Sequence, residues 1–181
     1  GHKIIESDLI DYTVTTRNER HKVKGQRIHL CTTPLPDEAV VVKDGKMISS
    51  PEMVFLEQAY DLSIHQLILL GMQLCSHNPR KPNIALTTKA KLAAFLAKTS
   101  KHRGHRKALR ALKYIIDDSA SVMESLAYMV MTLPNALGGF ALKGATLNPE
   151  IKLNAKAKKR LKRNRCFADL YYDSAKLDVE Y

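Results

Sequence analysis

The chain has 181 residues, of which 45% are hydrophobic and 26% charged, and its mean hydropathy is -0.24. These values are typical of a globular protein and exclude a disordered chain, and no apolar run approaches the roughly 18 residues of a membrane span. The net charge of +11 and the pI near 9.6 indicate a polyanionic partner, because basic side chains release counterions from phosphates. The three cysteines are far apart and odd in number, which excludes a disulfide framework or a zinc cluster and favours a reducing cytoplasm.

The first fifty residues predict strands and turns. QRIHLCTT and EAVVVKDGKMIS carry β-branched alternation, and Asp44-Gly45 is a turn signal. A helical stretch follows. SSPEMVFLEQAY predicts a helix after a Ser, because Pro51 suits the first turn and Glu52 suits the positive end of the helix dipole. Further helices are expected through Ile64–Cys75, in TTKAKLAAFLAKTS and in HRKALRALKYIID.

The last third of the chain predicts a helix followed by strands. SASVMESLAYMVMTL is a helix that Pro134 ends, and TLNPEIKL, RCFADLYY and KLDVEY are three strands, the first two separated by a Lys/Arg-rich segment. The predicted fold class is therefore α+β, with a β-rich N-terminal segment, a helical middle and an α-β-β-β core at the C-terminus. We place a domain boundary near Asp118, between residues 1–117 and 118–181.

The C-terminal stretch DLYYDSAKLDVEY predicts a hairpin around a four-residue turn, residues 173–176. This register pairs Tyr172 with Leu177, Tyr171 with Asp178, and Asp169 with Glu180. Facing residues share one side of a sheet, and like charges there are destabilising, so the last pair indicates a bound cation. The alternative is that the register slips by one residue and both carboxylates are simply solvated.

Two carboxylates beside a dense basic segment are suited to a Mg²⁺ or Mn²⁺ site for phosphodiester chemistry. Asp169 and Glu180 are the predicted metal ligands, and Asp178 is a solvated neighbour. Glu124 is a third candidate catalytic residue. Its alternative role is a capping box, because Ser121 lies three residues before it at the start of a helix.

Basic residues gather in two stretches of the sequence, and both are candidates for binding a nucleic-acid backbone. The predicted nucleic-acid-binding residues are Lys101, Arg103, Arg106, Lys107, Arg110, Lys159, Arg160, Lys162 and Arg163. We interpret Asn148, before Pro149, as a turn or strand-start residue.

The segments ALRALKYIIDDSASVMESLAYMVMTLPNALGGF, TLNPEI and RCFADLYYDSAKLDVEY together resemble the helix and first strands of the very-short-patch-repair-like branch of the PD-(D/E)XK nuclease superfamily. In that branch a helix with a Ser-x-x-Glu stretch precedes a strand meander with an Asp on the second strand and a Glu on the third. Glu124, Asp169 and Glu180 match those places, and the resemblance implies a site-supporting role for Asn148. MISSPEMVFLEQAYDLSIHQLILLGMQLC and HRGHRKALRALKYI resemble the region before such domains in bacterial proteins related to abortive-infection antitoxins.

This resemblance, over roughly residues 27–181, implies a restriction-endonuclease-like core with Mg²⁺ or Mn²⁺ as cofactor and a possible toxin or defence-system partner. The superfamily pattern continues after the Glu with one residue, a Lys or other polar group, a helix and a fourth strand. The chain ends at Tyr181, so we expect a C-terminally truncated form whose activity belongs to the complete protein.

Two functions stay open from the sequence. The first is a Mg²⁺-dependent DNA endonuclease of restriction, repair or defence type, inactive in this truncated form. The second is a non-catalytic, antitoxin-like or regulatory DNA-binding protein with a degenerate nuclease fold. An RNA-binding, ribosome-associated protein is a third alternative that rests on charge alone.

Overall fold

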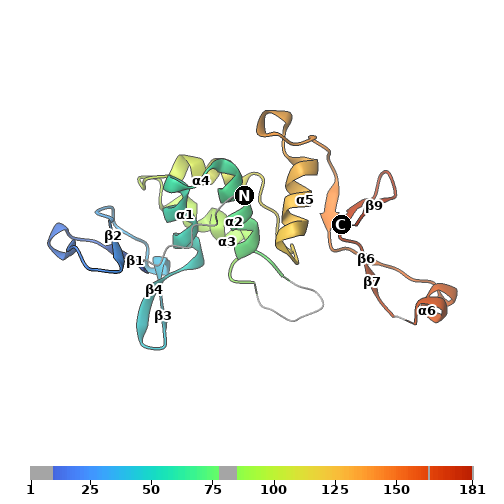
Figure 1. The fold of residues 1–181 in the computed structure, drawn as a ribbon, viewed down its shortest axis with the longest axis horizontal. Coiled ribbons are helices and arrows are strands. Elements are labelled where there is room, and N and C mark those ends of the chain that lie inside the picture. The colour runs from blue at the N-terminus through green and yellow to red at the C-terminus, as the bar shows by residue number, and fades with distance from the viewer. Residues whose placement is uncertain (1–9, 78–84, 163, 181) are drawn as a thin grey trace. The chain divides into compact units, whose positions relative to one another are not determined.

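The computed structural model describes residues 10–77, 85–162 and 164–180. Within these ranges six α-helices and several small sheets follow one another (Figure 1), which agrees with the predicted α+β class. The chain divides into two compact units, Gly1–Asp37 and Glu38–Tyr181. The boundary predicted near Asp118 lies inside the second unit and stays a prediction. Among the described residues, every helix is too short or too polar to pass through a lipid bilayer.

The first unit contains a small parallel pair of strands. β1 (Ile10–Val14) pairs with β2 (Gln26–Leu30), and a 3-10 turn at Arg17–Glu19 lies in the connection between them. Asp11 Oδ1 lies 2.6 Å from His29 Nε2 across the pair. The strand in QRIHLCTT was predicted, whereas β1 was not singled out.

The second unit opens with a short 3-10 turn at Asp37–Ala39, shared with the end of the first unit, and a hairpin. β3 (Val40–Lys43) and β4 (Lys46–Ser49) are antiparallel, as EAVVVKDGKMIS predicted. Asp44 and Gly45 connect them with φ of 51° and 72°. Two residues of positive φ match the twist of a two-residue hairpin, and Asp-Gly is well suited to it.

Three helices follow, each capped by a side chain of the residue before it. α1 (Pro51–Asp61), α2 (Ile64–Leu74) and α3 (Lys89–Lys98) begin after Ser50, Ser63 and Thr88, whose hydroxyls accept a backbone N–H of the first turn. These bonds satisfy amides that have no partner within the helix, which explains why the helices begin at the predicted positions.

The main core lies among α1, α2, α3 and α4 (His105–Leu112), which pack on one another. Its largest side chains are at most 1% exposed; they are Phe55, Leu56, Leu67, Ile68, Met72, Leu92, Leu96 and Ile115. Gly104 begins α4 with φ of 84°. A Cβ at this position would lie 3.1 Å from the backbone N of Tyr60, so glycine is required both by the conformation and by the close packing of α1.

α5 (Val122–Thr132) is the predicted helix before the strands, and it ends before Pro134. Its start is bonded to the end of α2. His77 N donates to Ser119 O at 3.1 Å, and Gln73 Nε2 donates to Ser125 Oγ at 2.8 Å. A 3-10 turn at Asn135–Leu137 follows α5.

The C-terminal part carries five short strands and one helix. β5 (Ala145–Leu147), β8 (Leu170–Tyr172) and β9 (Leu177–Val179) form an antiparallel sheet in the order β5-β8-β9, and α5 packs against β5 and β8. β6 (Glu150–Ile151) and β7 (Cys166–Phe167) form a separate antiparallel pair.

The Lys/Arg-rich segment between β6 and β7 contains a further helix, α6 (Ala155–Leu161), which the sequence analysis did not predict. Asn154 Oδ1 accepts the N–H of Ala157 at 2.8 Å and caps its start. Its residues are nearly all exposed, so capping and helix propensity, rather than packing, account for it.

Candidate functional site

The register of the C-terminal hairpin is the one predicted from the sequence. β8 and β9 pair Leu170 with Val179, Tyr171 with Asp178, and Tyr172 with Leu177. In the turn, Ala175 N donates to Tyr172 O at 3.2 Å and Lys176 N donates to Asp173 O at 3.3 Å. Continuing the register by one residue beyond the strands places Asp169 opposite Glu180. The alternative with both acids on opposite faces is therefore wrong.

The two carboxylates interact electrostatically. Partial desolvation raises the pKa of Glu180 above its ordinary value, and the negative charges of Asp169 and Asp178 raise it further. Asp169 is half-buried and Glu180 is exposed. Asp178 lies on the same face of β9 and is exposed, as predicted, and its negative charge contributes to the raised pKa of Glu180. The acidic cluster of Asp169, Asp178 and Glu180 holds its negative charges together at an electrostatic cost that a cation would relieve.

Glu124 is buried, with 5% of its surface exposed, in the first turn of α5. Ser121 Oγ caps the helix by accepting the N–H of Glu124 at 3.1 Å. The predicted capping box is only half formed, because the carboxylate of Glu124 accepts the N–H of Ala120 at 2.7 Å instead of returning to Ser121. The carboxylate is thereby drawn towards the loop before the helix.

Asn148 connects Glu124 to the strand end that carries Asp169. Its Nδ2 donates to Glu124 Oε2 at 2.6 Å, and its backbone N–H donates to Asp169 O at 3.2 Å. Asn148 thus links the side chain of Glu124 to the backbone of Asp169, whose side chain faces Glu180 across the hairpin. The bonds do not place the carboxylate of Glu124 beside the other two.

The acidic cluster has the chemistry that Mg²⁺ or Mn²⁺ prefers. The part of the chain that the structure describes holds no group of three or more His, Cys, Asp or Glu side chains arranged for a metal ion. Mg²⁺ retains several waters and is commonly bound by one or two carboxylates together with substrate phosphates. Asp169 and Glu180 could supply the oxygen donors. Partial desolvation and then the charges of Asp169 and Asp178 raise the pKa of Glu180, and a cation would offset those charges. The pair fits such an ion.

The basic residues around α4 fall into two groups. Lys107 Nζ donates to Tyr60 O at 3.0 Å and to Leu62 O at 2.8 Å, so its ammonium binds the C-terminal end of α1. The guanidinium of Arg103 stacks on Tyr60, 3.2 Å from the ring centroid. Lys101, Arg106 and Arg110 are exposed, and so is Arg103 despite its contact with Tyr60. Arg106 and Arg110 are the residues of α4 best placed to contact phosphates.

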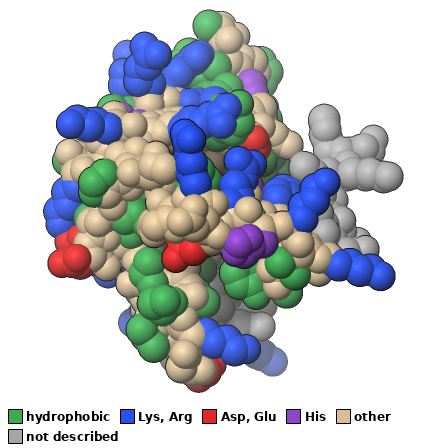
Figure 2. All heavy atoms as spheres, turned by 90° about the vertical axis from the view of Figure 1, so that its left-hand side faces the viewer, with side chains coloured by type: hydrophobic (Ala, Val, Ile, Leu, Met, Phe, Trp, Pro, Cys, Tyr) green, Lys and Arg blue, Asp and Glu red, His purple; other side chains and the backbone are tan. Residues whose placement is uncertain are grey.

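A second set of exposed basic residues lies on and just after α6; they are Lys156, Lys158, Lys159, Arg160 and Lys162. Arg163, also predicted to bind nucleic acid, lies outside the described residues. Arg165 Nε lies 3.5 Å from Glu150 Oε1 and is partly neutralised. Lys and Arg side chains are also numerous on the face seen in Figure 2. Exposed cations in this number suit a polyanion.

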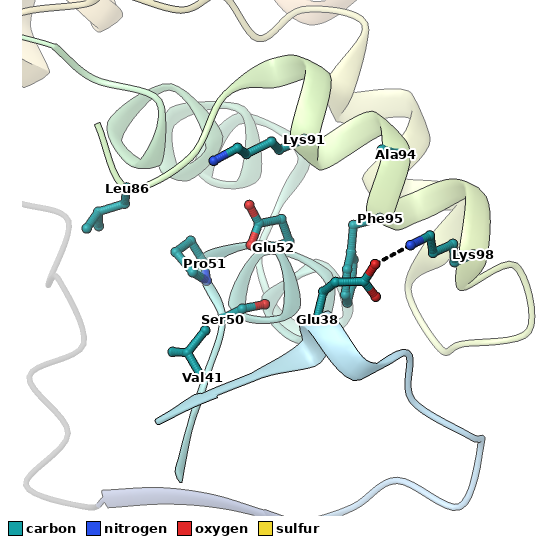
Figure 3. Close-up of a pocket in the computed structure, with 10 residues that line it drawn as sticks. All are labelled: Glu38, Val41, Ser50, Pro51, Glu52, Leu86, Lys91, Ala94, Phe95 and Lys98. Atoms are coloured by element: carbon teal, nitrogen blue, oxygen red, sulfur yellow. Dashed lines mark hydrogen bonds and ion pairs between the residues drawn. The ribbon is translucent and has the colours of Figure 1, made fainter. Parts of the chain in front are cut away.

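A pocket of about 560 Å³ lies beside the first turn of α1 (Figure 3), away from the predicted site residues. It is lined by Glu38, Val41, Ser50, Pro51, Glu52, Leu86, Lys91, Ala94, Phe95 and Lys98. Both carboxylates already have partners, since Glu38 is bonded to Lys98 and Glu52 accepts the hydroxyl of Thr87. The pocket is a mainly apolar hollow in which Glu38 and Lys98 form an ion pair.

No match to the chain was found among family models, curated proteins or solved structures.

Proposed function

We propose that the chain is part of a Mg²⁺-dependent endonuclease that hydrolyses phosphodiester bonds of DNA, of restriction, repair or defence type. The observation that carries the proposal is the placement of Asp169 opposite Glu180 at the open end of the β8–β9 hairpin. A chain under selection for folding alone gains nothing from two facing carboxylates. The order helix, strand, strand, strand in α5, β5, β8 and β9 supports the same proposal.

Each residue has a role in this proposal. Asp169 and Glu180 hold the cation, and Glu124 accepts a hydrogen bond from a nearby water. When bound, Mg²⁺ would act as a Lewis acid: it would lower the pKa of a coordinated water and neutralise charge on the phosphate. The exposed Arg106, Arg110 and the lysines of α6 hold the nucleic-acid backbone without reading its sequence.

A second candidate is a non-catalytic, antitoxin-like or regulatory DNA-binding protein. The observation that favours it is the exposed basic face of α4, where Arg106 and Arg110 lie one turn apart. This candidate needs the basic residues and does not need the carboxylates. The two proposals therefore differ in what they require of Asp169.

Mn²⁺ titration by calorimetry separates the two candidates, because metal binding requires only Asp169 and Glu180. Under the nuclease proposal the wild-type chain binds Mn²⁺ saturably, and Asp169→Ala abolishes this binding. The same variant should bind DNA as tightly as the wild type or more tightly, and it should lose any Mg²⁺-dependent nicking of plasmid DNA. Arg106→Glu with Arg110→Glu should lower DNA affinity under either proposal. Absence of Mn²⁺ binding by the wild-type chain would contradict the nuclease and leave the DNA-binding protein.

A further inference from the structure

Arg103 stacks on an exposed tyrosine at the end of α1. Its Cζ lies 3.2 Å from the centroid of the Tyr60 ring, and Tyr60 is 48% exposed. At this distance the guanidinium plane must lie close to parallel with the ring, because a steep tilt would push one of its nitrogens into the ring. Arg103 is itself exposed, so the ring covers one face of its guanidinium and the other face is open to solvent.

The loop that carries Arg103 is fixed by the residues that follow it. His105 Nε2 lies 2.8 Å from Leu96 O, and because a carbonyl oxygen can only accept, the ring N–H donates to the last turn of α3. Gly104 packs so closely on α1 that a Cβ there would lie 3.1 Å from Tyr60 N. The guanidinium is therefore positioned over Tyr60 in the free chain, and a preformed surface loses less entropy when a ligand binds.

The charge of Arg103 is not neutralised by a carboxylate. Arg103, Arg106 and Arg110 are all exposed, and none of them forms an ion pair within the described ranges. Asp61, which follows Tyr60 in the sequence, is exposed and likewise forms no ion pair there. A flat cation backed by an aromatic ring, with further cations on the next turns, suits a nucleotide, which combines a flat base with a negative phosphate.

We propose that the Tyr60–Arg103 pair binds an unpaired nucleotide: its base stacks on the open face of the Arg103 guanidinium, and Arg106 contacts a neighbouring phosphate. Tyr60 is a positioning residue that holds the guanidinium plane. A base within a duplex presents only its edges in the grooves, whereas an unpaired base presents its face. The pair therefore favours single-stranded DNA. The inference rests on the proposed DNA binding, which both candidate functions share, and adds the class of substrate.

The test measures, by fluorescence anisotropy on the full chain, the affinity for two labelled oligomers of equal length. One is single-stranded oligo(dT), and the other consists of abasic residues, which keep the phosphates and lack the bases. The wild type should bind oligo(dT) about 5- to 150-fold more tightly, the range for one stacked base. Arg103→Lys keeps the charge and removes the plane, so it should abolish this preference and leave the salt dependence of binding unchanged.

Two further variants distinguish stacking from charge. Arg106→Gln should weaken the binding of both oligomers equally, because a phosphate contact does not depend on the base. The matched control is Arg20→Lys, the same exchange at an exposed position in the first unit, which should keep the preference. Equal affinity of the wild type for both oligomers, or a preference that survives Arg103→Lys, would overturn the inference. Failure of the wild type to bind any DNA is a different outcome, because it contradicts the proposed function itself.

The role of Tyr60 is tested by a double-mutant cycle. Tyr60→Leu should lower the preference for oligo(dT) in the wild-type background and have little further effect in Arg103→Lys, because Tyr60 acts through the guanidinium. A measurement on the wild-type chain covers the case in which Tyr60→Leu does not fold. Ring current from a stacked base should shift the Nε–H proton resonance of Arg103 upfield when oligo(dT) is added. An equal shift with the abasic oligomer would overturn the stacking.

Discussion

Asp169 and Glu180 face each other where the β8–β9 hairpin opens, eleven positions apart in the sequence and with no basic side chain paired to either among the described residues. Partial desolvation and the neighbouring charges of Asp169 and Asp178 raise the pKa of Glu180. The arrangement opposes stability in the free chain, and a bound cation would offset that cost.

The first prediction concerns the pH dependence of stability. Because the pKa of Glu180 is raised above its ordinary value of 4.5, the folded chain holds the proton more tightly than the unfolded chain. The stability contributed by protonated Glu180 is complete below about pH 4.5 and is lost as the pH rises through the raised pKa.

Glu180→Gln should therefore raise the free energy of unfolding at pH 7 by roughly 0.2–1 kcal/mol, towards the lower end because Glu180 is exposed to screening solvent. Thermal unfolding with and without Mn²⁺ checks this, and Mn²⁺ should stabilise the wild type but not Glu180→Gln. Glu150→Gln is the control, because Glu150 pairs with Arg165 at 3.5 Å and its neutralisation should bring no gain. A lower Tm for Glu180→Gln at neutral pH without metal would contradict the prediction.

The second prediction concerns thiol reactivity. Burial raises the pKa of Cys75 to about 12, helped by the negative charge of Asp117, and the side chain is 1% exposed. At pH 8 only about one such thiol in ten thousand is ionised, so we expect iodoacetamide to modify Cys31 and Cys166, both half-buried, long before Cys75. Mass spectrometry of peptides from the native and the urea-unfolded chain measures this. Rapid modification of Cys75 in the native chain would show that the core around α2 is not closed.

The third prediction separates structural from nucleic-acid-binding cations. Lys107→Met removes an ammonium bonded to Tyr60 O and Leu62 O, and it should lower the free energy of unfolding by about 1.5–3 kcal/mol. Arg106→Gln, one position away and exposed, should leave stability unchanged.

DNA binding at several salt concentrations completes this comparison. Arg106→Gln should weaken binding and reduce the slope of log affinity against log salt by about 0.9, the value for one phosphate contact. A stability loss for Arg106→Gln as large as that of Lys107→Met would indicate that the basic face of α4 serves folding rather than binding.

The fourth prediction concerns the helical core. A Cβ on Gly71 would lie 2.2 Å from Ile115 Cδ1 and 3.0 Å from Phe55 Cε2, so Gly71→Ala should cost about 1–3 kcal/mol through overpacking. Ile115→Val removes the closest methyl group, so the double variant should recover part of the unfolding free energy that Gly71→Ala loses. Urea unfolding of both single variants and of the double variant measures this. If the losses of unfolding free energy in the two single variants simply add in the double variant, a residue other than Ile115 relieves the clash at position 71.

Much of the local structure could be predicted from the sequence, because its causes lie within a few residues. Ser50, Ser63 and Thr88 cap helices through bonds to amides three positions away, and Asp44-Gly45 turns a hairpin by its own backbone preferences. The α6 helix was not predicted because AKAKKRL carries no apolar helical repeat, although its start has an equally local cause in the Asn154 cap.

The sequence by itself determined that Asp169 and Glu180 share one face, because a four-residue turn and the two-residue period of a strand leave one register for the hairpin. Only the tertiary structure decided that Asn148 holds Glu124, that Lys107 binds the end of α1, and that β1 runs parallel to β2. These contacts join residues between 16 and 47 positions apart. Such pairs form only when separate elements pack together, and no periodicity or neighbouring residue encodes which ones will meet.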